Sequence, residues 1–194
     1  MAKRGLVSAL VIIAVIVVLG IIFSAWYVGT RNRLVTLEEN IDGAWAEIDN
    51  QLQRRNDLIP NLVATVKGFA TQEREVFTQI AEARAKLAGS QTVGETARNY
   101  NQLQSALGRL LVIVEAYPEL KSNQNFIRLQ DELAGTENRI AVARKRYNDS
   151  VRIFNTRIRR FPTSSIARMM GLEKKEYFEI EEQARQVPEV DFEN

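Results

Sequence analysis

The 194-residue sequence contains no cysteine and no histidine. The lack of cysteine excludes disulfides, thiol chemistry and lipid attachment through a thiol. The lack of histidine removes the most common general base near neutral pH and the Glu-x-x-His ligands of di-iron bundles. Zinc sites built from histidine and cysteine are excluded by both absences. We therefore expect no enzyme, no metal centre and no cofactor.

Charge is nearly balanced over the chain but unevenly placed. The net charge is +2, from 26 basic and 24 acidic side chains. From Glu173 to Asn194 there are eight acidic residues against three basic ones, so we expect residues 172–194 to form an acidic C-terminal tail. Basic and aromatic residues are not interleaved on one surface, which argues against a nucleic-acid partner. No small-molecule substrate is expected either.

Four arginines gather near the end of the last long helical stretch: Arg157, Arg159, Arg160 and Arg168. One interpretation is a solvated helix end, where cations are favoured by the helix dipole. The others are contact with the acidic tail and contact with lipid headgroups. These arginines are therefore candidates for a lipid or acidic-tail contact.

One long uncharged run indicates a membrane anchor. Residues 6–28 contain no charge and would form a helix of about 35 Å, enough to span a bilayer. Trp26 and Tyr27 close the run, where amphipathic rings favour the membrane–water interface. A cleavable signal peptide is the weaker interpretation, because the run is long and lacks a small-x-small cleavage site. Residues 1–5 would form a short tail before the anchor.

Orientation follows from the flanking positive charges. Lys3, Arg4 and the amino terminus lie on one side of the run, and Arg31 and Arg33 on the other. Positive groups favour the cytosolic side. The sequence therefore predicts a cytosolic N-terminus, with the rest of the chain on the non-cytosolic side.

Beyond the anchor the apolar spacing is helical. A seam at steps of three and four runs from Ile41 to Leu87, interrupted by Arg55 and Glu73, and predicts one long arm with coiled-coil-like packing. After a turn at residues 89–94, a second helix is expected near 95–116, ended by Tyr117-Pro118. A third begins near residues 122–125 and ends at Phe161-Pro162.

A short helix over residues 166–170 is then expected, capped by Thr163, Ser164 or Ser165. No strand-like alternation of any length occurs. The predicted fold is all-α: an N-terminal transmembrane helix followed by an antiparallel bundle of three to four long helices over residues 31–171.

The polar stretch RRNDLIPNLV, residues 54–63, interrupts the first arm. Pro60 lacks an amide hydrogen and clashes with the carbonyl four residues earlier. It either bends one helix or lies in the first turn of a second helix capped by Asp57. Because the seam keeps its phase across Pro60, we favour a bend in one arm.

The sequence after the anchor resembles the LemA family of bacterial membrane-anchored proteins. The resemblance is carried by residues 44–45, 48–49, 53–63, 65–70, 82–84, 117–123, 126, 129–130, 137–140, 143–144, 147–148, 154–155 and 161–162. It implies a single-pass protein of the cytoplasmic (inner) membrane with an antiparallel helical bundle, and no established catalytic centre. Gln72-Glu73 stands where a histidine often precedes the glutamate, so any role of that histidine is lost.

The polar residues of the bundle admit two interpretations. They either cap helices and bridge them, as register-setting positions, or they line a groove at Pro60 that binds a peptide or ligand. The pairs Tyr100-Asn101, Tyr147-Asn148 and Phe154-Asn155 share one form, which we interpret as coincidence or helix packing.

Two function hypotheses follow. The first is a non-enzymatic envelope scaffold that self-associates through apolar residues at the base of the arm, with the membrane and another copy as partners. The second is an adaptor that presents substrates to a membrane protease or another envelope complex through the groove beside Pro60. Paired carboxylates such as Asp57 and Glu73 make an enzyme the weakest alternative. The candidate interaction residues are Ile41, Trp45, Ile48, Leu52, Arg54, Arg55, Asp57, Pro60 and Asn61.

Overall fold

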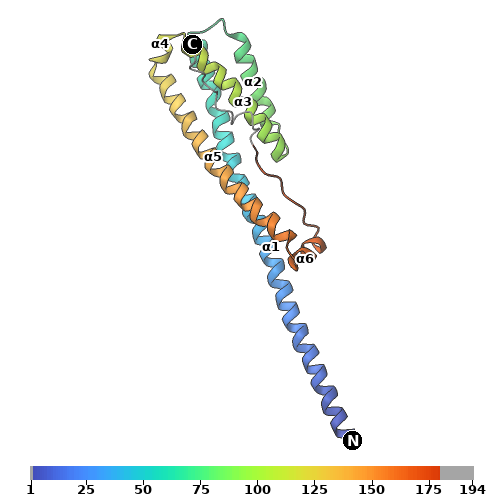
Figure 1. Cartoon of the computed structure of the whole chain (residues 1–194). Coiled ribbons are helices and arrows are strands. Elements are labelled where there is room, and N and C mark those ends of the chain that lie inside the picture. The colour runs from blue at the N-terminus through green and yellow to red at the C-terminus, as the bar shows by residue number, and fades with distance from the viewer. Residues whose placement is uncertain (1, 180–194) are drawn as a thin grey trace, which may run out of the picture. The chain divides into compact units, whose positions relative to one another are not determined.

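The computed structural model describes the backbone of residues 2–179 and the side chains of residues 10–179 (Figure 1). Its helices are α1 (Ala2–Lys67), α2 (Arg74–Ala88), α3 (Val93–Val114), α4 (Pro118–Lys121), α5 (Gln124–Arg159) and α6 (Thr163–Met169). No strand occurs among these described residues. The all-α prediction is confirmed.

The chain divides into two compact units. The first comprises the described residues up to Asp42 together with Ser150–Lys175, and the second comprises Gly43–Asp149 together with the described residues from Glu176 onward. Helices α1 and α5 each contribute to both units.

The start of α1 has the composition of a membrane span. Large apolar side chains from Leu10 to Phe23 are more than half exposed. Helix α1 is long and apolar enough to cross a bilayer, and no other helix of the described residues meets that test. A single N-terminal membrane anchor is thus supported by length and composition.

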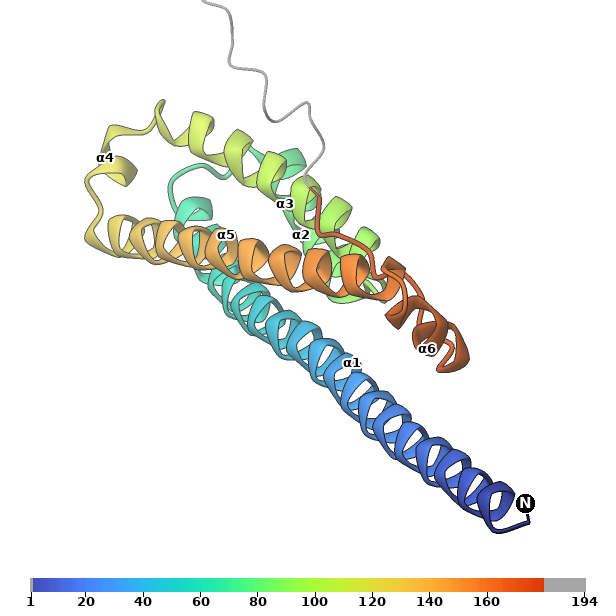
Figure 2. The same ribbon diagram turned by 60° about the horizontal axis from the view of Figure 1, so that its bottom comes forward.

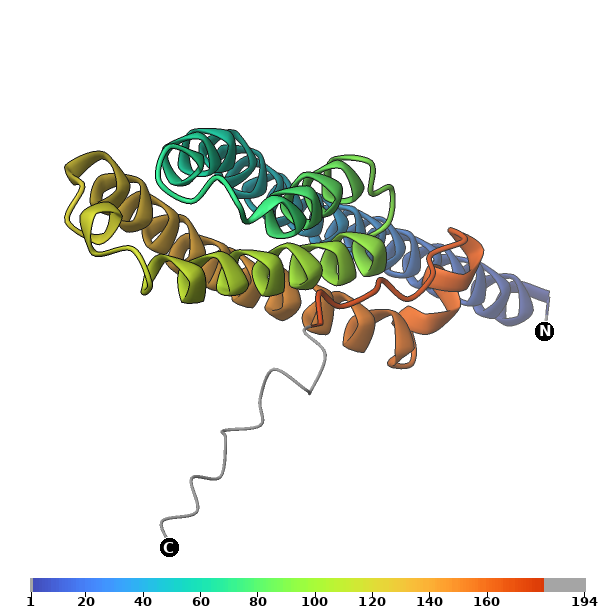
Figure 3. The ribbon, with the colours of Figure 1, turned by 90° about the horizontal axis from the view of Figure 1, so that it is seen from above.

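In the second unit, α1 and α2 lie antiparallel. Arg84 of α2 donates from Nε to Asn56 Oδ1 at 2.9 Å, and the Lys67 ammonium lies 5.2 Å from the Phe77 ring centroid. Later residues of α2 therefore meet earlier residues of α1. Figure 3 shows α2 and α3 side by side.

The same reversal relates α3 to α2 and α5 to α1. Asn99 donates to the Lys86 carbonyl at 3.1 Å, while Arg109 donates to Gln79 at 2.8 Å. In α5, Leu133 and Tyr147 contact α1 at Arg55 and Trp45, respectively. The portions of α1, α2, α3 and α5 in this unit form an antiparallel four-helix bundle, with α4 in the connection between α3 and α5 (Figure 2).

The predicted single arm from Ile41 to Leu87 is wrong. The chain reverses at residues 68–73, where the amides of Phe69 and Ala70 close α1 by binding the Val66 carbonyl at 3.0 and 2.9 Å. Both α1 and α2 bury a stripe at helical spacing, ending in Val66 and resuming at Phe77. The spacing of apolar residues does not reveal whether the chain reverses its direction, so the two stripes were interpreted as one continuous seam.

Pro60 lies inside α1 and is exposed. The helix continues on both sides of it, so the alternative of two helices separated at Pro60 is wrong. Asn56 loses the backbone donor that residue 60 would otherwise supply to its carbonyl. Because Pro60 is exposed, water can donate a hydrogen bond to the Asn56 carbonyl instead.

The reversal also corrects the proposed self-association surface. Ile41, Ile48 and Leu52 are 3%, 0% and 5% exposed within one chain. Helix α2 runs back along α1, α3 reverses again, and α5 then runs antiparallel to α1. In the second unit, α5 therefore covers the part of α1 around Trp45. Trp45 remains half-buried. The four residues do not form a free apolar row, and the basis for an oligomer through them is removed.

In the first unit, α6 packs on α1. Leu34, Ile166 and Ala167 are buried together, and Tyr27, Ile158, Met170 and Leu172 are partly buried against them. Figure 2 shows α6 folded back after the end of α5. The expected capping role of Thr163, Ser164 and Ser165 is wrong, because these residues are the first turn of α6 and Pro162 precedes it.

Candidate functional site

A buried arginine connects three helices of the second unit. Arg55 of α1 is 5% exposed, and its Nη1 lies 2.8 Å from Glu137 Oε2 of α5. The same nitrogen donates to the Leu133 carbonyl at 3.2 Å, and Nη2 donates to Gln104 of α3. This arrangement confirms the interpretation of Arg55 as a bridge between helices.

Tyr100 of α3 completes this polar network. Its hydroxyl donates to Glu137, as does the amide of Gln104, and the Arg55 guanidinium lies 5.9 Å from its ring centroid. Burial raises the pKa of Tyr100 well above its usual range, and the neighbouring Glu137 carboxylate raises it further. The hydroxyl therefore stays a hydrogen-bond donor.

An aromatic cluster lies next to the network. Phe178, from the segment after α6, is 1% exposed. Its ring centroid lies 6.2 Å from those of Trp45 and Tyr100, and the Arg144 guanidinium is 5.0 Å away. Trp45 and Tyr147 meet edge to face at 5.5 Å. Three helices thus enclose one aromatic side chain of the C-terminal segment.

A single asparagine holds the backbone of that residue. Asn148 donates from Nδ2 to the Phe178 carbonyl at 3.1 Å and accepts from the Phe178 amide at 2.9 Å. The Tyr147 hydroxyl donates to the Glu176 carbonyl at 2.9 Å. The primary amide satisfies both backbone groups of one residue, an arrangement that we term a backbone clamp.

The first unit contains a second backbone clamp. Asn155 is 4% exposed, donates to the Lys175 carbonyl and accepts from the Lys175 amide, both at 2.9 Å. The Lys175 ammonium pairs with Glu38 at 2.7 Å. The repeated aromatic–asparagine pairs at 147–148 and 154–155 are therefore not coincidence, although Asn101 makes no such clamp. The repeat was visible in the sequence, but we interpreted it as coincidence or helix packing, so both asparagines were missed as site residues.

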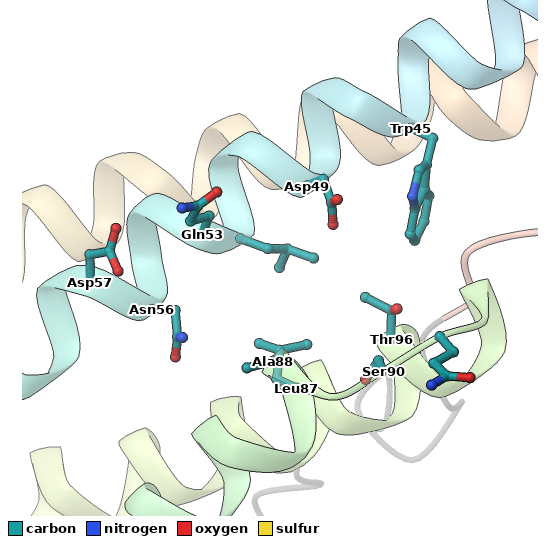
Figure 4. A pocket seen from close by; sticks show the side chains of 11 residues that line it. Trp45, Asp49, Gln53, Asn56, Asp57, Leu87, Ala88, Ser90 and Thr96 are labelled. Atoms are coloured by element: carbon teal, nitrogen blue, oxygen red, sulfur yellow. The ribbon is translucent and has the colours of Figure 1, made fainter.

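Trp45 also lines a pocket of about 440 Å³ (Figure 4). Trp45 and Asp49 point from α1 toward the turn between α2 and α3, which carries Ser90. We call this cavity the Trp45 pocket. Its lining residues are Trp45, Asp49, Leu52, Gln53, Asn56, Asp57, Leu87, Ala88, Ser90, Gln91 and Thr96.

The lining of the Trp45 pocket suits binding. Asp49, Gln53 and Asp57 are exposed, so their polar groups are available to a partner. The lining holds two carboxylates and no lysine or arginine. Three residues predicted from sequence, Trp45, Leu52 and Asp57, meet here, while Asp49 and Gln53 were missed as contributors.

A model described as the LemA family matches residues 44–192. The chain belongs to the LemA family. The matched region contains the network, both backbone clamps and the Trp45 pocket. It leaves out the apolar part of α1.

Several proteins of known name are similar to this LemA-family chain. Magnetosome proteins MamQ 1 and MamQ 2 of Paramagnetospirillum magneticum are each 27% identical, over 91% of this chain and 74% of theirs. Magnetosome protein MamQ of Magnetospirillum gryphiswaldense is 26% identical over 76% of this chain and 64% of its own. Protein LemA of Metamycoplasma hominis is 27% identical over 83% of this chain and 74% of its own. Together with the anchor-like start of α1, the family places this chain among membrane-associated proteins.

The remaining predicted residues of this LemA-family chain lie apart from the Trp45 pocket. Arg54 and Asn61 are exposed on α1. Pro60 lines a groove of about 260 Å³ between α1 and α2, together with Ile59, Val63, Ala64, Lys67, Phe77, Ile80, Ala81 and Arg84.

The four arginines predicted for lipid or tail contact lie in the first unit. Arg159, Arg160 and Arg168 are exposed, and Arg157 is half-buried. Residues 180–194, most of the expected acidic tail, lie outside the described residues, and so does any contact that they make.

Proposed function

We propose that this protein is a non-enzymatic, membrane-anchored scaffold of the bacterial envelope that holds a segment of a partner protein in the Trp45 pocket. The pocket itself carries the proposal, because it combines a half-buried tryptophan with exposed carboxylates and amides. Aromatic residues are enriched where proteins bind one another. The anchor would keep the bound partner at the membrane.

The charge of the pocket specifies the partner's chemistry. Asp49 and Asp57 favour a basic side chain, and no cation in the lining competes with it. A lysine or arginine beside Asp49 can also lie against the neighbouring Trp45 ring, which attracts cations through its π face. The expected partner segment therefore carries a basic residue, and its binding should weaken with salt.

A charge-reversal pair tests this function. Asp49→Lys places a cation in the pocket, whereas Glu47→Lys makes the same charge change on an exposed α1 position outside the lining. Proteins that co-purify stoichiometrically from native membranes should be lost with Asp49→Lys and retained with Glu47→Lys. Equal retention by both variants would show that the Trp45 pocket does not hold the partner.

The groove beside Pro60 supports a second candidate, an adaptor that presents substrates to a membrane protease. This groove is lined largely by apolar side chains of α1 and α2, which suits an unfolded apolar segment. Ala64→Trp would fill it. The adaptor function predicts slower turnover of client proteins in this variant with unchanged binding at the Trp45 pocket; unchanged turnover would reject it.

We further propose that the N-terminus is cytosolic and that the bundle lies beyond the inner membrane, as the flanking charges favour. The chain has no cysteine, so one introduced at exposed Val142 is a unique label site. A membrane-impermeant maleimide should label Val142→Cys in spheroplasts without lysis. Labelling only after lysis would reverse the assignment.

A further inference from the structure

Helix α6 lies at the level where the membrane span ends. It packs on α1 through Leu34 and also reaches Tyr27, which closes the apolar run. Leu34 follows the last residue of that run, Val28, by six residues, or about 9 Å of helix. The headgroup layer of a bilayer extends roughly 5–8 Å beyond its hydrocarbon core on each side. Since α6 packs between these two positions, it lies beside the headgroup layer.

Two large apolar side chains of this region are left facing solvent. Phe161, just before α6, is 85% exposed, and Met169, its last residue, is 75% exposed. Outside the membrane span, only Val112 among the described large apolar side chains is exposed to a comparable degree. Exposed aromatic and apolar side chains beside a membrane span are typical of groups that enter the interface.

The same region is strongly basic. From Ser150 to Leu172 there are five arginines and no acidic residue. Three of these arginines are exposed and adjoin the two apolar residues in the sequence: Arg159 and Arg160 precede Phe161, and Arg168 precedes Met169. Long arginine side chains can place their apolar stems along the interface and their guanidinium groups among lipid phosphates.

We propose that the end of α5, the turn that follows it and α6 together form a membrane-surface contact. Phe161 and Met169 enter the boundary between headgroups and acyl chains, and Arg159, Arg160 and Arg168 bind anionic headgroups. The contact is continuous with the anchor, because α6 packs on the end of the span. It gives the first unit a second attachment to the bilayer, and it goes beyond the proposed function, since it does not involve the Trp45 pocket.

Fluorescence quenching in vesicles tests the insertion. Phe161→Cys and Met169→Cys are labelled singly with an environment-sensitive dye, using the full chain reconstituted in phosphatidylcholine vesicles with or without phosphatidylglycerol. Spin-labelled lipid should quench both dyes several-fold more than it quenches a dye at Val142→Cys, an exposed control in the second unit. Dyes at 161 and 169 that respond to an aqueous quencher as strongly as the dye at 142 would overturn the proposal.

Two further variants distinguish whether the arginines bind lipid headgroups or the acidic tail. Replacing Arg159, Arg160 and Arg168 with glutamine should remove the extra quenching that phosphatidylglycerol produces, while the helical circular dichroism stays unchanged because all three are exposed. Deleting residues 180–194 should leave the quenching unchanged. If lipid quenching arose only after that deletion, the arginines would bind the tail and the proposal would be wrong.

Discussion

At the scale of single residues, the Arg55–Glu137 pair fixes how three helices meet. Taking charges out of water costs free energy, which an ion pair recovers only with additional hydrogen bonds. Arg55 makes them by donating to the Leu133 carbonyl and to the Gln104 side-chain oxygen. Arg55 can satisfy these partners only when α1, α3 and α5 are in the observed register, so the network selects one packing of the bundle.

A double-variant cycle tests this role of Arg55. Arg55→Met should lower the free energy of unfolding by about 2–3 kcal/mol, below the range for fully buried pairs because the Glu137 side chain is 34% exposed. Adding Glu137→Met should restore part of that loss, since no unpaired carboxylate is left. Urea unfolding in mild detergent gives these values. Strictly additive losses would contradict coupling between the two residues.

Tyr100 gives the network a pH signature. Because the folded state raises the pKa of its hydroxyl, the folded chain keeps a proton that the unfolded chain releases near pH 10. Stability from this group is thus complete below about pH 10 and falls as the pH rises further. The melting temperature should drop less between neutral pH and pH 11 in Tyr100→Phe than in the wild type. Parallel curves would show that Tyr100 is not responsible.

Asn148 should hold the C-terminal segment in place. Asn148→Ala removes both hydrogen bonds to the Phe178 backbone and should cost about 2–3 kcal/mol. Hydrogen exchange at the Phe178 amide should become faster. Asn148→Asp is the matched control, because its carboxylate can still accept from that amide. Unaltered exchange in Asn148→Ala would mean that the aromatic cluster alone holds Phe178.

At the scale of elements, the sequence specifies where helices stop better than how they turn. Tyr117-Pro118 and Phe161-Pro162 interrupt helices as predicted, and Asn123 caps α5 by accepting from the amides of Asn125 and Phe126. Proline and asparagine act locally, so their effects are readable from the sequence. The reversal between α1 and α2 was missed because residues 68–73 contain no proline and the apolar period resumes in phase.

The candidate site was predicted only in part for a related reason. Trp45, Asp49 and Leu52 follow one another on one face of α1 at steps of four and three, so periodicity could have included Asp49. The turn at Ser90 joins them only through the packing of α2 and α3. The backbone clamps were missed because the segment around Phe178 is rich in charge and has no regular period, which is typical of a tail.

Pro60 tests the continuity of α1. Pro60→Ala restores the donor to the Asn56 carbonyl and removes the ring clash, so it should stabilise the chain by up to about 3 kcal/mol. The exposed position leaves room for alanine. A higher melting temperature in mild detergent is the expected result. A large loss of stability would indicate that the groove beside Pro60 depends on the proline.

At the scale of the whole molecule, an apolar N-terminal helix leads into a helical bundle, and we propose that this bundle carries the binding surface. Burial of Ile48 and Leu52 means that one chain can complete its own core. Trp45→Glu should therefore destabilise the single chain, since Trp45 contacts Tyr147 and Phe178.

The anchor has a direct test. Changing Val15 and Ile16, both more than half exposed in the apolar part of α1, to lysine should prevent insertion, because each central charge costs about 3 kcal/mol on insertion scales. The double variant should appear in the soluble fraction after alkaline extraction. Exchanging the same residues for leucine is the matched control and should leave the protein in the membrane. Full resistance of the lysine variant to extraction would reject the anchor.

Site-specific photocrosslinking in native membranes tests most directly whether the Trp45 pocket holds a partner. A photoreactive amino acid at Gln53, inside the Trp45 pocket, should yield a discrete crosslinked product that carries a basic segment of a partner, and Asp49→Lys should abolish it. The same amino acid at Glu47, outside the lining, should yield no such product. An identical pattern from both positions, insensitive to Asp49→Lys, would contradict a scaffold that holds its partner in this pocket.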